Sequence, residues 1–107
     1  MTLRLPEALP LATLQVEVLW PDGSPAIEGA RAFAEGKGAR AAFEHAAHRS
    51  NRVTLTLALH RRYDISVDWL YDKPRTFQLV EGDAPQSVNF THDGQSVTLR
   101  LKNPRPR

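Results

Sequence analysis

Apolar and polar residues alternate along most of this chain, which is the pattern of β-strands that bury one face in a core. Three runs show the alternation clearly, within residues 14–20, 53–59 and 63–71. Their apolar positions are Leu14, Val16, Val18 and Trp20 in the first run, Val53, Leu55, Leu57 and Leu59 in the second, and Tyr63, Ile65, Val67, Trp69 and Tyr71 in the third. Each run therefore predicts a strand with one side in the core.

The last third of the chain predicts further strands. Phe77 and Leu79 continue the alternation more weakly after Asp72-Lys73-Pro74. Asp93-Gly94 is a strong signal for a type I′ turn, because both central residues of that turn need a positive φ. A two-residue turn there would pair Phe90 with Val97 and place both side chains on one face. The sequence therefore predicts a closing β-hairpin.

Residues 26–48 are compatible with two structures. The segment 39–48 has high helix propensity, but it is short for an independent helix and follows Gly36-Lys37-Gly38. Two strands, about 29–35 and 39–47, joined by that Gly-Lys-Gly turn, match the pattern of the rest of the chain. We expect strands here, with a helix over 39–48 as the alternative.

Together these segments predict about seven short strands, an all-β antiparallel two-sheet sandwich of the transthyretin-like or Ig-like kind, or a small barrel. Residues 1–10 contain two prolines and no clean period, which is typical of a linker or N-terminal arm. Residues 103–107 contain two more prolines and predict a C-terminal tail. The sandwich domain is expected to span residues 11–102.

Composition narrows the class of protein. The 107 residues are 41% hydrophobic and 24% charged, as expected for one globular core. The absence of cysteine excludes disulfides and thiolate metal sites. No run approaches the ~20 apolar residues of a membrane span, so no membrane insertion is expected. Pro6, Glu7 and Pro10 argue against a signal peptide, which leaves a cytoplasmic protein or a piece of a longer exported chain.

Several segments resemble the carboxypeptidase regulatory-like domains, which belong to the transthyretin-like (prealbumin-like) sandwiches. In this family an opening strand enters a turn that contains Asp-Gly and Pro, and a Gly-Ala pair then begins the next strand. Residues 16–25 and Gly29-Ala30 of this chain match that pattern. A leucine-rich strand, a short turn and a Tyr that opens an alternating strand match residues 53–57, 60–62 and 63–67, and the closing strand matches 97–101. Fibronectin-type sandwiches share the spacing from Leu57 to Tyr63 and remain an alternative.

This resemblance implies a non-catalytic accessory module in an extracytoplasmic, periplasmic or secreted, bacterial protein. Its partners would be a protein or neighbouring domains of the same chain. Some transthyretin-like proteins are hydrolases that end in Tyr-Arg-Gly-Ser, whereas this chain ends in residues 103–107, Asn-Pro-Arg-Pro-Arg. Tyr63 is expected to make a tyrosine-corner hydrogen bond to upstream backbone, which is a structural role.

The polar residues predict little chemistry. His45 and His48 could share a metal only on a helix, because an odd spacing places them on opposite faces of a strand. Asp64, Ser66 and Asp68 could bind calcium together with loop oxygens, but they fit the wet face of an antiparallel sheet better. The serines lie in no nucleophile-elbow context, and no phosphate-binding loop is present. We therefore expect no enzyme activity, cofactor or metal.

Two surfaces remain as candidates for binding a ligand or partner. The first is aromatic, formed by Trp20, Trp69 and Tyr71, and would define a carbohydrate-binding module if the rings were exposed together. The second is basic, formed by Arg61 and Arg62. These two arginines would gather with Arg49 and Arg52 if the two loops are neighbours. Nucleic-acid binding is disfavoured, because the net charge is only +2 and the aromatic residues fall on core faces.

Overall fold

This computed structural model describes residues 11–47, 49–104 and 106. Eight strands lie within these residues, close to the number expected. They are β1 (Leu11–Leu19), β2 (Ala30–Gly36), β3 (Ala39–His45), β4 (Arg52–Ala58), β5 (Arg61–Lys73), β6 (Thr76–Glu81), β7 (Gln86–Phe90) and β8 (Gln95–Arg100). The expected strand near residues 39–47 is confirmed as β3, and the helical alternative is wrong. The described residues include no helix that is long and apolar enough to cross a membrane.

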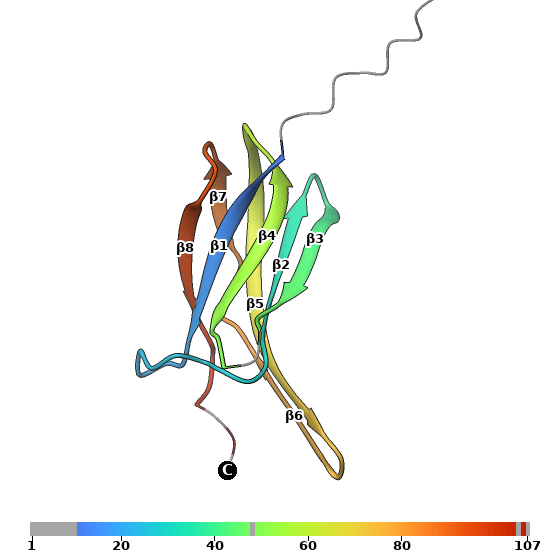
Figure 1. Cartoon of the computed structure of the whole chain (residues 1–107), viewed down its shortest axis with the longest axis vertical. Coiled ribbons are helices and arrows are strands. Elements are labelled where there is room, and N and C mark those ends of the chain that lie inside the picture. Colours follow the sequence, from blue (N-terminus) through green and yellow to red (C-terminus); the bar gives the residue numbers. More distant parts are fainter. Residues whose placement is uncertain (1–10, 48, 105, 107) are drawn as a thin grey trace, which may run out of the picture.

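The strands form two packed sheets, so the predicted all-β sandwich is confirmed (Figure 1). One sheet has three strands in the order β4-β1-β8. The other has five, in the order β3-β2-β5-β6, with β7 also paired to β5. Every pairing is antiparallel except that of β1 with β8, which is parallel.

The core lies between the two sheets and follows the predicted alternation. Even-numbered residues of β1 and odd-numbered residues of β4 and β5 face inward. The largest fully buried side chains are Trp69, Phe90, Leu14, Leu55, Ile65, Leu101, Val16, Val18 and Val53. Burial of these side chains supplies the main driving force for folding, at about 25 cal/mol per Å² of apolar surface.

The predicted closing hairpin is wrong, because β7 and β8 belong to different sheets. Phe90 on β7 lies opposite Arg61 on β5, whereas Val97 on β8 lies opposite Val16 on β1. Phe90 and Val97 both point into the core, but they do so from opposite sides. The Asp93-Gly94 segment therefore carries the chain across the sandwich from one sheet to the other.

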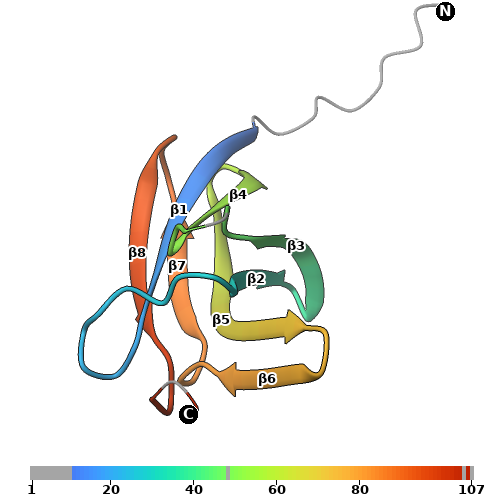
Figure 2. The same ribbon diagram turned by 60° about the horizontal axis from the view of Figure 1, so that its bottom comes forward.

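The β5–β6 hairpin forms an arm that extends beyond the rest of the five-stranded sheet (Figures 1 and 2). The first part of β5 pairs with β7, and the last part, Asp68–Lys73, pairs with β6. Trp69 lies opposite Val80, so the even-numbered residues of β6 face inward. The strand expected at Phe77 and Leu79 is confirmed, but these two side chains lie on the outer face and not in the core.

Two hydrogen bonds join strand β5 to earlier parts of the chain, the end of β4 and the loop before β2. Tyr63 donates its hydroxyl hydrogen to the carbonyl oxygen of Ala58 at 2.9 Å, which confirms the predicted tyrosine corner. Trp69 donates its Nε1–H to the carbonyl oxygen of Ile27 at 2.8 Å. Gly29 lies so close that a Cβ there would be 2.3 Å from the carbonyl oxygen of Leu70. The glycine of the Gly-Ala pair is therefore required by a close backbone approach.

Candidate functional site

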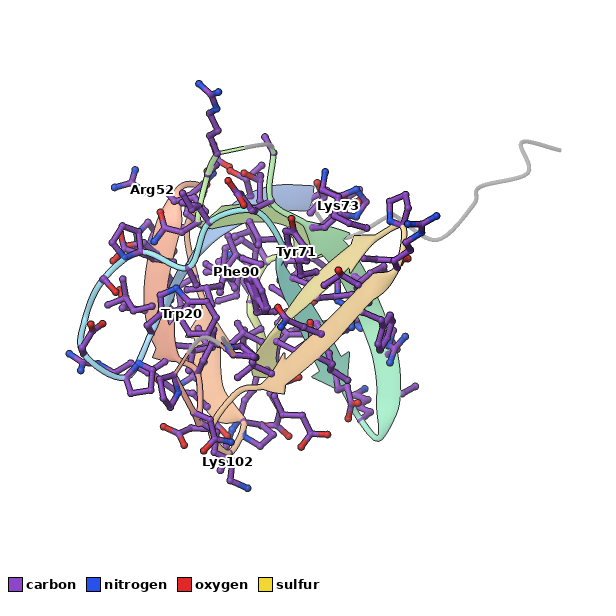
Figure 3. The ribbon with its side chains drawn as sticks, turned by 90° about the horizontal axis from the view of Figure 1, so that it is seen from below. Trp20, Arg52, Tyr71, Lys73, Phe90 and Lys102 are labelled. Carbon is purple, nitrogen blue, oxygen red and sulfur yellow. The ribbon has the colours of Figure 1, made fainter. Side chains whose placement is uncertain are left out.

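The aromatic side chains considered as a sugar-binding surface lie mostly inside the sandwich. Trp69 is 0% exposed and Trp20 is 8% exposed, and their rings meet edge to face with centroids 5.1 Å apart. Tyr71 is half-buried and stacks on Trp69, with centroids 5.7 Å apart. Figure 3 shows Trp20 between the two sheets together with Phe90. Neither tryptophan therefore meets the exposure that a flat carbohydrate platform requires.

Arg61 and Arg62 lie at the other end of β5 from Tyr71. Both arginines are exposed, and they help to line a groove of about 750 Å³. The other residues that line this groove are Glu35, Gly36, Lys37, Ala41, His60, Tyr63, Asp64 and Ser87. The structure thus separates the arginine pair from the aromatic group, so the five residues proposed from the sequence do not form one site.

Charges of both signs are mixed in this groove. Lys37 and the two arginines lie near Glu35 and Asp64. Ser87 donates its hydroxyl hydrogen to Asp64 Oδ1 at 2.7 Å. Activation of a serine needs a base that takes its proton and a group that orients the base, and a serine–carboxylate pair lacks that arrangement. The groove is polar, but its opposite charges favour no strongly charged ligand.

The acidic residues of β5 are held by neighbouring side chains. Asp68 receives two hydrogen bonds from Arg31, from Nε to Oδ1 at 2.7 Å and from the guanidinium Nη2 to Oδ2 at 2.5 Å. Asp64 is bonded to Ser87, as described above. Across the described residues, no three His, Asp or Glu side chains come close enough together to hold a metal ion. His45 ends β3, and His48 lies outside the described residues.

The four arginines do not gather, because the two loops that would have brought them together are not neighbours. Arg52 begins β4 opposite Glu17, near the end of β1, and its Nε lies 3.8 Å from Glu17 Oε2. Arg61 begins β5, after β4 has run the length of the sheet (Figure 1). Arg49 and Arg52 therefore lie at the opposite end of the sandwich from Arg61 and Arg62.

A second feature, on the outer face of the five-stranded sheet, combines aromatic rings with arginines. Phe33 on β2 stacks on Phe43 on β3, with centroids 4.9 Å apart and planes inclined by 14°. The Arg31 guanidinium lies 5.5 Å from the Phe33 centroid and 5.7 Å from that of Phe43. Arg40 lies 5.1 Å from the Phe33 centroid. These are cation–π distances, and they hold two aromatic rings on a face that meets solvent.

The arm extends this feature with aliphatic and aromatic side chains. Phe77 is 68% exposed, Leu79 is 46% exposed and Phe43 is 40% exposed. Leu70 lies opposite Leu79, and Leu70 and Phe43 line a common groove of about 360 Å³. We call the set Phe33, Phe43, Leu70, Leu79 and Phe77 the outer apolar row. Apolar side chains gathered on a solvent-exposed face mark contact surfaces more often than isolated exposed residues do.

The outer apolar row was not among the residues proposed from the sequence. Alternation shows that Phe77 and Leu79 share a face, but it does not show whether that face is inside or outside. The residues between Phe77 and Leu79 and after them did carry a signal that the apolar pair need not face the core. The alternate positions of β6 hold Gln78 and Val80, so neither face of that strand is clearly polar.

Comparisons of this chain with protein-family models, with curated proteins and with solved structures found no match.

Proposed function

We propose that this chain is a non-catalytic interaction module that binds a protein through the outer apolar row and the β5–β6 arm. The observation that carries the proposal is the exposure of Phe77 and Leu79 on an arm that projects from the sandwich. Leaving two large apolar side chains in water is unfavourable, by roughly 1.5–3 kcal/mol for each one relative to its burial. A protein surface that covers these side chains would recover that free energy.

The chemistry of the row favours a protein over a sugar as partner. Carbohydrate-binding surfaces present flat rings together with polar groups, whereas both tryptophans are buried here. Phe77 and Leu79 offer apolar contact area, and β6 offers an edge to which another strand can add. The resemblance to carboxypeptidase regulatory-like domains supports a place as an accessory module of a larger exported protein.

Site-specific photo-crosslinking tests the proposal. A photoreactive phenylalanine analogue placed at Phe77 in the full-length protein should give a cross-linked protein product of reproducible mass when the source cells are irradiated. The matched control is the same analogue at Thr56, which is exposed on the outer face of the three-stranded sheet. A product from Phe77 and none from Thr56 is expected. Equal yields at both positions, or none at either, would contradict the proposal.

A further inference from the structure

The exposed edge of β6 has a defined set of unpaired backbone groups. Gly82 donates its N–H to the carbonyl oxygen of Val67 on β5, and hydrogen bonding alternates along an antiparallel strand. The even-numbered residues of β6 therefore bond to β5. The amides and carbonyls of Phe77, Leu79 and Glu81 point the other way. The bond from Lys102 N–H to the carbonyl oxygen of Glu81, at 2.9 Å, agrees with this direction.

The length of this edge is limited at both ends. The carbonyl of Glu81 is already bonded to Lys102, and Pro74-Arg75 forms the turn that precedes β6. Phe77 and Leu79 remain, and within the described residues no partner bonds to their backbone groups on this side. A strand that adds here can therefore use the N–H and C=O of two residues.

The sequence of β6 fits a second copy of itself in that register. In an antiparallel pair centred on Gln78, Phe77 lies opposite Leu79 of the second copy, and Leu79 lies opposite the second copy's Phe77. Both positions have outward-pointing backbone groups, so each of these two residue pairs exchanges two hydrogen bonds. A twofold axis perpendicular to the sheet keeps all four side chains on the same outer face, where each Phe contacts a Leu.

The charges that flank the strand are complementary in the same register. Arg75, in the turn directly before β6, comes near Glu81 of the second copy, and the twofold axis repeats this approach. The carbonyl of Glu81 stays bonded to Lys102, so the exposed Glu81 side chain is the group that Arg75 would meet. Both residues are exposed, and neither forms an ion pair with another described residue. Within one chain Arg75 precedes β6 and Glu81 ends it, so the whole strand, at roughly 3.3 Å per residue, separates them and they do not pair with each other.

The β3 edge of this sheet lacks these properties. β3 carries Arg40 and Glu44 along its length, and charged residues protect an edge strand from pairing. β6 has no charged residue between Thr76 and Val80. An uncharged edge of high β-propensity is the kind that pairs with another strand.

We propose that two copies of this chain pair through the β6 edges, so that their five-stranded sheets join into one sheet. This inference rests on the proposed function, because it names the partner whose side chains pack beside Phe77 and Leu79. The contact is short and falls at the small end of protein interfaces, so the pairing is weak and depends on concentration.

Sedimentation velocity of the whole chain over a range of concentrations tests the pairing. The wild-type chain should shift from monomer to dimer as concentration rises. Arg75→Glu and Glu81→Arg each replace two attractive pairs with two repulsive ones, and each should weaken the dimer by about tenfold. An equal mixture of the two variants should dimerise again, because one chain then presents acidic side chains at both positions and the other presents basic ones. Arg61→Glu, at the other end of β5 from the arm, is the matched control and should leave the dimer unchanged.

The outcomes separate this inference from the proposed function. Restored association in the mixture, with thermal unfolding unchanged in each variant, would support pairing through β6. A chain that stays monomeric at every concentration, while Phe77 still cross-links to a different protein, would overturn the self-pairing and leave the proposed function standing. Dimers that ignore both charge reversals would also overturn it, because the contact would then lie elsewhere.

Discussion

The carboxylate of Asp93 accepts two hydrogen bonds from Thr13, one from the backbone N–H at 2.8 Å and one from the side-chain hydroxyl at 2.9 Å. Gly94 completes the contact by donating its N–H to the carbonyl oxygen of Thr13 at 2.9 Å. These bonds join the β7–β8 connection to the first residues of β1. They hold the chain where it crosses from the five-stranded sheet to the three-stranded sheet.

The first prediction concerns the pH dependence of this contact. The backbone and side-chain hydrogen bonds from Thr13 lower the pKa of Asp93 below its ordinary value of 3.8. A group whose pKa is lower in the folded state stabilises the fold above the unfolded value. That stabilisation should be complete above about pH 3.8 and lost as the pH falls through the folded pKa.

NMR titration of the Asp93 carboxyl carbon checks this prediction. We expect a midpoint below 3.8 in the wild-type chain, moving towards 3.8 in Thr13→Ala. In acid-unfolding curves, Asp93→Asn should remove part of the pH dependence below pH 3.8. A midpoint at or above 3.8 would show that the bonds from Thr13 do not form in solution.

The second prediction concerns two glycines at close backbone contacts. A Cβ at Gly29 would lie 2.3 Å from the carbonyl oxygen of Leu70, and one at Gly82 would lie 2.3 Å from that of Val67. Gly29→Ala and Gly82→Ala should each lower the free energy of unfolding by about 2 kcal/mol or more, because backbone must move. Gly36→Ala is the control, since its Cβ would lie 3.4 Å from the Tyr63 ring. Urea unfolding that gives equal losses at all three positions would refute the packing described here.

The third prediction concerns the tyrosine corner. Tyr63→Phe keeps the ring, which meets Phe90 edge on at 6.5 Å, and removes the hydroxyl that bonds to Ala58. Loss of one such hydrogen bond should lower the free energy of unfolding by about 1 kcal/mol. Chemical denaturation measures the change, and the slope of the unfolding transition should stay the same. An unfolding free energy equal to that of the wild type would mean that the corner contributes nothing to stability.

The fourth prediction compares two arginines. Arg31 bonds to both oxygens of Asp68 in a half-buried position, whereas the exposed Arg52 only approaches Glu17, at 3.8 Å. Arg31→Lys keeps the charge but loses the paired bonds and the flat contact with Phe33, at a cost of about 1 kcal/mol. Arg52→Lys should change stability by a few tenths of a kcal/mol at most, as expected for an exposed pair. Thermal unfolding of the two variants measures both losses of stability. A larger loss in Arg52→Lys than in Arg31→Lys would contradict this prediction.

Much of this fold could be predicted from the sequence, because the period-two alternation identifies strands directly. The buried faces of β1, β4 and β5 follow from that pattern, as does the role of Tyr63. Asp93-Gly94 led to the wrong prediction of a closing hairpin. Such a pair favours a tight turn locally, but the same two residues can also occur where the chain crosses from one sheet to the other. Which of the two occurs depends on long-range partners such as Thr13, and these partners cannot be seen in a local pattern.

The candidate site was less predictable than the fold. Trp20 and Trp69 look alike in the sequence whether they seal a core or face a ligand, and only packing distinguishes the two cases. Phe77 and Leu79 alternate as core residues do, yet the register of β6 against β5 turns them outward. That register follows from the pairing of Trp69 with Val80 on the inner face, which is a tertiary contact.

Amide hydrogen exchange tests the proposed contact surface most directly. The chain alone at low micromolar concentration would be compared with the same chain in the complex that cross-linking at Phe77 identifies. We expect the amides of Phe77 and Leu79, which face away from β5, to exchange rapidly in the dilute chain and much more slowly in the complex. Equal rates at these amides in both samples, with slowing confined to the groove near Arg61 and Arg62, would contradict it.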